Sequence, residues 1–219
     1  MKKYIVIVAG GNGSRMGSDT PKQFLDLLGL PLLMHTLKKF QQSISEGEII
    51  LVLPEKEQST WLFLCEKHQF DVSHQVVNGG KSRFHSVKNA LQKVSEKSIV
   101  TIHDGVRPLV SENVINNCMQ TAKNFGAAIP TLPIQDSIRK ISDNGSKIVD
   151  RSQFVLVQTP QCFQSEIILK AYQQEYHKSF TDDASVVEQL GYNIYLVEGN
   201  KENIKITTPE DLKLAEALV

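Results

Sequence analysis

Short apolar runs alternate with stretches of helical periodicity along most of this chain. The runs are rich in β-branched residues and predict strands at 4–8, 49–53, 72–77, 99–102 and 127–132. Between them, apolar residues recur at helical spacing, as at Phe84, Val87 and Leu91. This order predicts an α/β fold with three layers, a largely parallel sheet between two layers of helices. Ligands of such sheets bind beyond the carboxyl ends of the strands.

Two segments depart from this alternation. Residues 133–155 carry short strand-like runs on either side of Ser142-Asp143-Asn144-Gly145, which predicts a β-hairpin arm with an Asn-Gly turn. Because an isolated hairpin is only marginally stable in water, the arm is expected to pack on a partner subunit or on its own domain. Residues 203–207 predict a short strand, and Thr208-Pro209-Glu210-Asp211 predicts the capped start of a helix. The buried stripe of that helix is expected to comprise Leu212, Ala215 and Leu218.

Composition narrows the class of protein. A chain of 219 residues fits one domain, 1–219, with the arm as its extension. Its 24 basic and 24 acidic residues balance, so no overall field favours nucleic acid or an anionic membrane. No segment approaches the roughly 20 apolar residues that a membrane span needs. Three scattered cysteines, expected in the core, fit a reducing cytoplasm: Cys65, Cys118 and Cys162. We therefore expect a cytoplasmic protein that binds neither nucleic acid nor membranes.

A glycine-rich segment follows the first predicted strand. It comprises Ala9-Gly10-Gly11-Asn12-Gly13-Ser14-Arg15-Met16-Gly17 and is closed by Pro21-Lys22-Gln23. Glycines let backbone N–H groups approach an anion, and Arg15 and Lys22 add cations suited to phosphate oxygens. The spacing fits neither a dinucleotide fingerprint, because Met16 takes the third glycine position, nor a Walker loop. A phosphate-handling site is the functional hypothesis, and an ordinary tight turn is the alternative.

Other charged residues fall near the same predicted sheet edge. Asp104 follows a predicted strand, where it could support a Mg²⁺–triphosphate, hydrogen-bond a sugar hydroxyl or cap the turn. Arg107 is equally ambiguous, and Lys205 lies within the last predicted strand. The two acids of Thr181-Asp182-Asp183 favour a helix start. No histidine has zinc-binding spacing and no covalent nucleophile is evident. Phosphoryl or nucleotidyl transfer requires none, since charge neutralisation and alignment do most of the work.

Eight motifs, taken in order, resemble the 2-C-methyl-D-erythritol 4-phosphate cytidylyltransferase family of isoprenoid biosynthesis over nearly the whole chain. They are AGGxGxRM at 9–16, PKQ at 21–23, GGxxRxxS at 79–86, HDxxRP at 103–108, VDR at 149–151, QTPQ at 158–161, TDxAS at 181–185 and NIKIT at 203–207. The resemblance implies a three-layer, Rossmann-like nucleotidyltransferase fold with a mostly parallel sheet and a protruding β-hairpin arm. It also implies transfer of CMP from CTP to the phosphate of methylerythritol phosphate, with release of pyrophosphate.

The same resemblance implies a cofactor, a partner and roles for residues. Mg²⁺ would be held mainly by the substrate phosphates rather than by a set of protein ligands, and the arm would join a homodimer. For catalysis, the negative charge of the triphosphate would be neutralised by Arg15, Lys22 and Lys205. The nucleotide would lie against Ala9, Gly10, Gly11, Gly13, Gly80, Arg83 and Ser86. The polyol phosphate acceptor would be bound by Asp104, Arg107, Thr159 and Thr181, with Ser137 and Arg151 reaching from the arm into the partner's site.

Three alternatives stay open at this point. Ribitol 5-phosphate cytidylyltransferases share the glycine segment, although Val149-Asp150-Arg151 and Gln158-Thr159-Pro160-Gln161 favour methylerythritol phosphate. A sugar-1-phosphate nucleotidylyltransferase is disfavoured because the chain is short for that class. A non-catalytic nucleotide-binding regulator would not need Arg15, Lys22 and Lys205 together.

Overall fold

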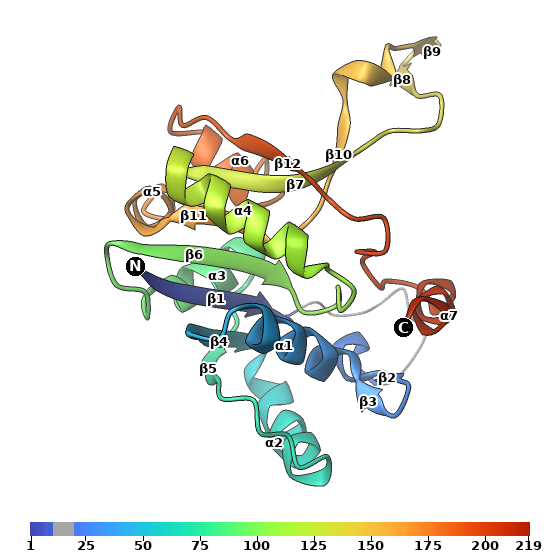
Figure 1. Ribbon diagram of the computed structural model, residues 1–219. Coiled ribbons are helices and arrows are strands. Elements are labelled where there is room, and N and C mark those ends of the chain that lie inside the picture. Colours follow the sequence, from blue (N-terminus) through green and yellow to red (C-terminus); the bar gives the residue numbers. More distant parts are fainter. Residues whose placement is uncertain (11–19) are drawn as a thin grey trace.

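The computed structural model of the protein describes residues 1–10 and 20–219. Within them, a central sheet of eight strands has the order β10-β7-β11-β6-β1-β4-β5, with β12 paired to β7 (Figure 1). Strand β1 pairs in parallel with β4 and β6, and β4 with β5. Strands β10 and β11 run antiparallel to their neighbours. The mostly parallel α/β sheet predicted from the sequence is confirmed.

The strands of this sheet and the helices around it have well-defined bounds. The strands are β1 (Lys2–Val8), β4 (Gly47–Leu53), β5 (Gln75–Asn78), β6 (Ser98–Asp104), β7 (Ala127–Pro133), β10 (Val155–Val157), β11 (Gln161–Gln164) and β12 (Tyr195–Glu198). The helices are α1 (Leu32–Ser43), α2 (Gln58–Lys67), α3 (Arg83–Leu91), α4 (Glu112–Phe125), α5 (Ser165–Ala171), α6 (Asp183–Glu188) and α7 (Pro209–Leu218). Two small antiparallel pairs complete the list: β2 (Asp26–Leu27) with β3 (Leu30–Pro31), and β8 (Arg139–Ser142) with β9 (Gly145–Ile148).

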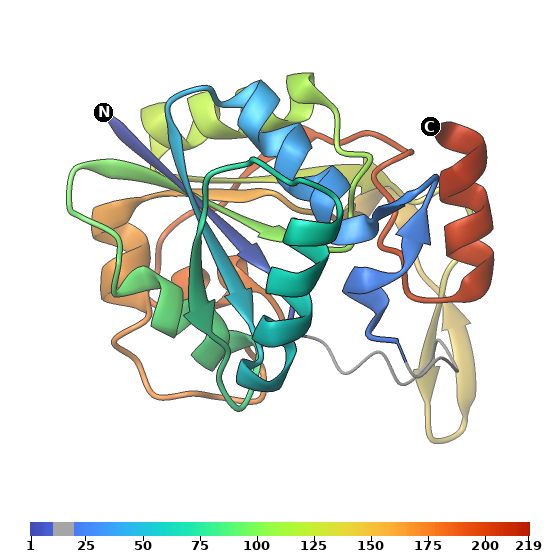
Figure 2. The same cartoon turned by 90° about the horizontal axis from the view of Figure 1, so that it is seen from below.

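Helices cover both faces of the sheet, which explains the nearly continuous apolar run of β1. Tyr4 and Val6 join a core formed with α3, α5 and α6 on one face. Ile5 and Ile7 point the other way, into a core with α1, α2 and α4. Figure 2 shows the sheet between these two helix layers.

The carboxyl ends of the central strands meet at one edge of the sheet. Val8 at the end of β1 lies level with Val52 on β4 and Asp104 on β6. Backbone hydrogen bonds fasten the departing loops there, from Ala9 N–H to the Val52 oxygen (3.0 Å) and from Gly105 N–H to the Val8 oxygen (2.9 Å). This edge is therefore a rigid base for side chains that leave it.

The predicted arm is a β-hairpin that extends away from the sheet (Figure 1). Strands β8 and β9 lie in it, and all eight of their residues are exposed. Apolar side chains on the arm and on β10 beside it are also exposed: Ile141, Ile148, Phe154, Val155, Leu156 and Val157. The arm thus presents an apolar surface rather than packing on its own body.

Several local predictions were wrong. Residues 203–207 form no strand: Ile206 N–H bonds to the Val106 oxygen, but the Asn203 oxygen accepts from the side chains of Arg107 and Gln158 rather than from a neighbouring strand. In place of the predicted strand at 72–77 there is a shorter strand that begins and ends later, Gln75–Asn78. In α7 the capping box of Thr208 and Asp211 is confirmed and Ala215 is buried, but Leu218 is 43% exposed at the chain end. Cys118 and Cys162 lie in the core, whereas Cys65 is only partly buried.

None of the helices described is long and apolar enough to cross a membrane.

Candidate active site

A cleft of about 320 Å³ opens at the carboxyl edge of the sheet. Its lining comes from the end of β1, the 3₁₀ turn Lys22–Phe24, Pro54 after β4, the start of α3, the end of β6 and the segment before α7. Eight of the residues predicted to form the site lie in this lining: Ala9, Gly10, Lys22, Gly80, Arg83, Ser86, Asp104 and Lys205. The structure thus brings together residues from five parts of the chain.

Gly80 and Ser86 form a tight corner of the cleft. The Ser86 hydroxyl accepts a hydrogen bond from Gly80 N–H at 3.0 Å, and Ser86 itself is buried. A Cβ at position 80 would overlap the Cβ of His85 and lie 2.8 Å from its carbonyl carbon. Ser82 caps α3 by accepting from His85 N–H, which fixes the turn between the two. Only glycine fits this corner without moving the helix start.

Asp104 is the electrostatic centre of the cleft. Its Oδ2 lies 3.1 Å from Arg107 Nε and 3.0 Å from Lys205 Nζ, and its Oδ1 lies 3.9 Å from Arg83 Nε. Burial alone raises the pKa of the Asp104 carboxyl, but the charges of Arg83, Lys205 and Arg107 together hold that pKa well below its usual range. Asp104 is therefore an anion that holds Arg107 and Lys205 in contact, with Arg83 farther away at 3.9 Å.

Arg83 is held from two sides. Its Nη1 and Nη2 donate to the two oxygens of Asp183 at 2.8 and 2.6 Å, in addition to the longer contact with Asp104. Burial of the guanidinium lowers its pKa, yet the Asp183 carboxylate more than offsets this and the net pKa is raised. Arg83 is permanently charged at the wall of the cleft.

A buried polar network supports Asp104 from behind. His103 Nε2 donates to the Arg107 carbonyl oxygen at 3.0 Å, and His103 Nδ1 lies 2.9 Å from the Thr159 hydroxyl. That hydroxyl also accepts from Asp104 N–H at 3.2 Å. Burial lowers the pKa of His103 to about 4, so the ring is neutral at physiological pH. The network fixes the backbone on both sides of Asp104.

Lys205 lies on a segment whose position is fixed mainly by hydrogen bonds to side chains. Asn203 Nδ2 donates to the Thr159 carbonyl oxygen at 2.7 Å. The Asn203 carbonyl oxygen in turn accepts from Arg107 Nη1 at 2.7 Å and from Gln158 Nε2 at 3.2 Å. Ile206 N–H bonds to the Val106 oxygen at 3.0 Å. These bonds replace the ladder of the predicted strand and place the Lys205 ammonium beside Asp104.

The remaining predicted site residues lie elsewhere. Gly11, Gly13 and Arg15 fall outside the described residues. Thr159 is 5% exposed and lies behind Asp104 rather than in the cleft wall. Thr181 is exposed before α6, and Ser137 and Arg151 are on the arm, where Arg151 Nη1 donates to the Gln135 carbonyl oxygen. None of these three lines the cleft of the single chain.

Sequence reasoning missed several residues of the site. Gln23 lines the cleft at 1% exposure, and among the residues described no hydrogen-bond partner reaches its Oε1. Its place in the Pro21-Lys22-Gln23 motif was the available signal. His103 likewise lies in the HDxxRP motif, in which the sequence alone gives it no role. The sequence indicates Asp183 only as part of a helix start, and nothing local pairs it with Arg83.

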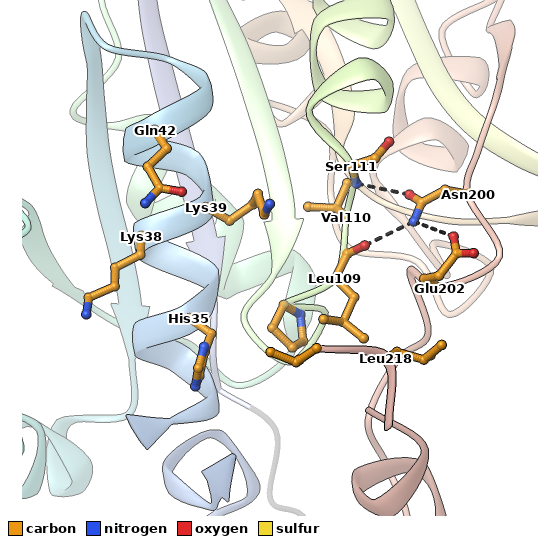
Figure 3. Close-up of a pocket in the computed structure, with 12 residues that line it drawn as sticks. His35, Lys38, Lys39, Gln42, Leu109, Val110, Ser111, Asn200, Glu202 and Leu218 are labelled. Atoms are coloured by element: carbon orange, nitrogen blue, oxygen red, sulfur yellow. Dashed lines mark hydrogen bonds between the residues drawn. The ribbon is translucent and has the colours of Figure 1, made fainter. Parts of the chain in front are cut away.

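A second cavity, of about 520 Å³, lies between α1 and the loop before α4 (Figure 3). His35, Lys38 and Lys39 of α1 line one side, and Asn200 and Glu202 the other. The Asn200 side chain links its own segment to the loop before α4, because its Nδ2 donates to the Leu109 carbonyl oxygen and its Oδ1 accepts from Ser111 N–H. None of the predicted site residues that the structure describes lines this cavity.

The charge of the cleft defines what it can bind. Two carboxylates, of Asp104 and Asp183, lie in or beside the cleft. Among the described residues, five cationic side chains line the cleft or contact Asp104: Lys22, Lys81, Arg83, Arg107 and Lys205. The excess of positive charge suits a polyanion such as a nucleoside triphosphate. Ligands of α/β sheets bind at the carboxyl ends of the strands, so the fold and the charge of the cleft together fit an enzyme that acts on nucleotide phosphates.

Comparison with known proteins identifies the family to which the chain belongs. A sequence model of the family described as 2-C-methyl-D-erythritol 4-phosphate cytidylyltransferase (IspD) matches residues 4–219. Proteins of that name from Bacteroides thetaiotaomicron and Bacteroides fragilis are 52% and 51% identical over 219 residues, covering all of each chain. The crystal structure of the enzyme of that name from Thermus thermophilus has a TM-score of 0.78 at 32% identity, covering 100% of this chain and 98% of that one. The chain therefore belongs to the 2-C-methyl-D-erythritol 4-phosphate cytidylyltransferase family, a family of nucleotidyltransferase enzymes.

Proposed function

We propose that this protein transfers CMP from CTP to 2-C-methyl-D-erythritol 4-phosphate, giving 4-diphosphocytidyl-2-C-methyl-D-erythritol and pyrophosphate. The observation that carries the proposal is that Lys22, Arg83 and Lys205 line one cleft, with Arg83 and Lys205 beside Asp104. Family membership supplies the substrates, since the relatives are named for this reaction.

The proposed reaction is an in-line displacement at the α-phosphorus of CTP. An oxygen of the acceptor phosphate forms a bond to the α-phosphorus while the bond from that phosphorus to the bridging oxygen breaks, and pyrophosphate leaves with the electron pair. The nucleophile is already an anion, so no general base is needed. What opposes the step is repulsion between two polyanions, and fixed cations reduce it. We assign this role to Lys22, Lys205 and Arg15.

The nucleotide would be aligned by the tight corner of the cleft. Gly80 and Ser86 line the cleft where the Gly80 N–H bonds to the Ser86 hydroxyl, and we place the cytidine against this corner. Ala9 and Gly10 line the same cleft and would lie along the nucleotide. The family resemblance assigns the same role to Gly11 and Gly13, which fall outside the described residues. Arg83 would donate to phosphate oxygens from the cleft wall.

The donor set fits Mg²⁺ held mainly by the substrate phosphates. Among the residues described, no three His, Cys, Asp or Glu side chains cluster as a metal site. Among the same residues, the nearest cation to Asp104 Oδ1 is Arg83 Nε at 3.9 Å, which is beyond hydrogen-bond distance. We therefore assign this oxygen to the ion, as its one protein ligand. Mg²⁺ is commonly bound by one or two carboxylates plus phosphates, and when bound it neutralises charge on the triphosphate.

We further propose a homodimer in which each arm completes the partner's site. The exposed apolar side chains of the arm and β10 support this, because such patches usually mark protein contacts. Ser137 and Arg151 would then bind the acceptor phosphate in the partner's cleft. Asp104, Arg107, Thr159 and Thr181 would position the acceptor from the chain's own side, with Thr159 acting through the backbone of Asp104.

We infer a cytoplasmic location for the protein. Its three cysteines are free thiols, and Cys118 and Cys162 are fully buried in a core that contains no disulfide among the described residues. This use of cysteine fits a reducing compartment.

The test of the function compares acceptors. Purified protein is incubated with CTP and Mg²⁺ and with either 2-C-methyl-D-erythritol 4-phosphate or ribitol 5-phosphate, and kcat/KM is obtained from pyrophosphate release. A clear preference for the first acceptor supports the proposal. Preference for ribitol 5-phosphate would keep the chemistry and overturn the acceptor. No release with either would favour a non-catalytic nucleotide-binding regulator.

A further inference from the structure

Asp183 is a buried acid whose placement the proposed reaction leaves unexplained. It lies on the first turn of α6 with no exposed surface, and both oxygens of its carboxylate are in use. Arg83 donates to each of these oxygens, and the Tyr172 hydroxyl donates to Oδ1 at 2.5 Å. Burying such a carboxylate is costly unless its partners are well placed.

The geometry of the contact controls which donors Arg83 has left. A guanidinium carries five N–H groups in one plane, and Asp183 takes one from Nη1 and one from Nη2. The Nε edge lies on the other side, 3.9 Å from Asp104, and Arg83 lines the cleft with 27% of its side chain exposed. The donors that Asp183 does not use are therefore the ones next to the cleft.

Asp183 also decides how Arg83 and Asp104 interact. Without it, Asp104 would be the nearest carboxylate to the guanidinium, already within 3.9 Å of Nε. Arg-carboxylate pairs favour a bidentate arrangement, so a released Arg83 would close onto Asp104. That closure would withdraw the donors of Arg83 and an oxygen of Asp104 from any ligand.

We propose that Asp183, oriented by Tyr172, is a positioning residue that holds Arg83 away from Asp104 with its remaining donors directed at phosphate oxygens of the bound nucleotide. The inference rests on the proposed function, because it takes the cleft to be the nucleotide site. It concerns preorganisation rather than chemistry: Asp183 touches neither substrate.

A double-mutant cycle tests this inference. Asp183→Asn, Arg83→Gln and the double variant are compared with the wild-type protein by the Kd for CTP with Mg²⁺, measured calorimetrically, and by the KM for CTP and kcat. We expect Asp183→Asn to weaken CTP binding about tenfold in the wild-type background and to have almost no effect once Arg83 is Gln. Asp71→Asn, at an exposed aspartate outside the cleft, is the matched control. An equal loss in both backgrounds would overturn the proposal, because it would show that Asp183 acts through the fold and not through Arg83.

A milder variant covers the case in which Asp183→Asn does not fold. Tyr172→Phe removes one hydroxyl and keeps the ring, which stacks on Phe84. We expect it to raise the Kd for CTP about threefold, again only while Arg83 is present. Tyr176→Phe, whose ring also contacts Phe84 but which is 45% exposed, is its control and should leave binding unchanged. Equal effects of the two Tyr→Phe changes would refute the role of Tyr172 and Asp183.

The binding measurement separates this inference from the proposed function. If the wild-type protein binds CTP but releases no pyrophosphate with either acceptor, the function fails while the cycle in Kd still decides the role of Asp183. If the wild-type protein does not bind CTP, both fail. If turnover is normal and the cycle shows no coupling, the function stands and the role of Asp183 is refuted.

Discussion

Replacing Lys205 by alanine separates charge neutralisation from folding. The ammonium of Lys205 lies 3.0 Å from Asp104 Oδ2 and lines the cleft. It is held there by the bonds of Asn203 and Gln158, so the charge is in place before the substrate arrives. Loss of one preorganised donor of this kind typically lowers the rate by about 10²–10³. We therefore expect Lys205→Ala to lower kcat at least about a hundredfold.

The same substitution should have little effect on stability. The Lys205 side chain is 40% exposed, and ion pairs at partly exposed positions contribute about 0.2–1 kcal/mol. For a chain of this size such a loss lowers Tm by no more than about 4 °C. Arg107 also remains on Asp104 Oδ2, so the carboxylate is not left unpaired.

The assay is pyrophosphate release at saturating CTP, acceptor and Mg²⁺, with Tm measured on the same preparations. Lys201→Ala is the matched control, because Lys201 is an exposed lysine in the same segment that does not line the cleft. Near-normal turnover by folded Lys205→Ala would refute the assigned role. A large fall in Tm accompanying the loss would instead indicate that the segment had been displaced.

The site leads to three further predictions. Gly80→Ala should cost about 1–3 kcal/mol and raise the KM for CTP, because the new Cβ meets backbone of His85; unchanged melting and kinetics would contradict this. The free energy of unfolding should fall as pH drops from 6.5 towards 4, since unfolded His103 binds a proton in this range while folded His103, with a pKa of about 4, does not. In urea titrations His103→Gln should reduce that slope, and an identical slope would exclude His103 as its source. Finally, mixing inactive Arg151→Ala and Lys205→Ala chains should restore turnover if the arm serves the partner's site, whereas no restoration would indicate that each arm serves its own chain.

Much of the fold and of the cleft could be predicted from the sequence because the relevant signals are local. The strand at β1 is a run of residues buried on both faces, and such runs have few alternatives once they end in glycine. The motifs around Gly80, Asp104 and Lys205 each follow or precede a regular element. Parallel strands place those positions at one edge, so motifs far apart in sequence meet there.

The rest depends on tertiary partners that a local pattern does not reveal. Asp183 is 100 residues from Arg83, and an acid in a first helical turn has the same pattern whether it faces solvent or a buried guanidinium. Asn203–Thr207 alternates polar and apolar residues as a strand does, yet its backbone bonds to side chains of Gln158 and Arg107. The roles of all the predicted site residues stay predictions, and Ser137, Thr181 and Arg151 do not line the cleft of one chain.

The way the segment before α7 is held has a consequence for mutational tolerance. In a strand, main-chain hydrogen bonds keep the backbone in place, so most side chains are tolerated at exposed positions. Here Asn203 and Gln158 do that work with their amide groups, and Asn200 anchors the start of the segment to Leu109 and Ser111. A saturation scan scored by growth should therefore find these three amides nearly as intolerant as the lysine they position, although none of them would touch a substrate.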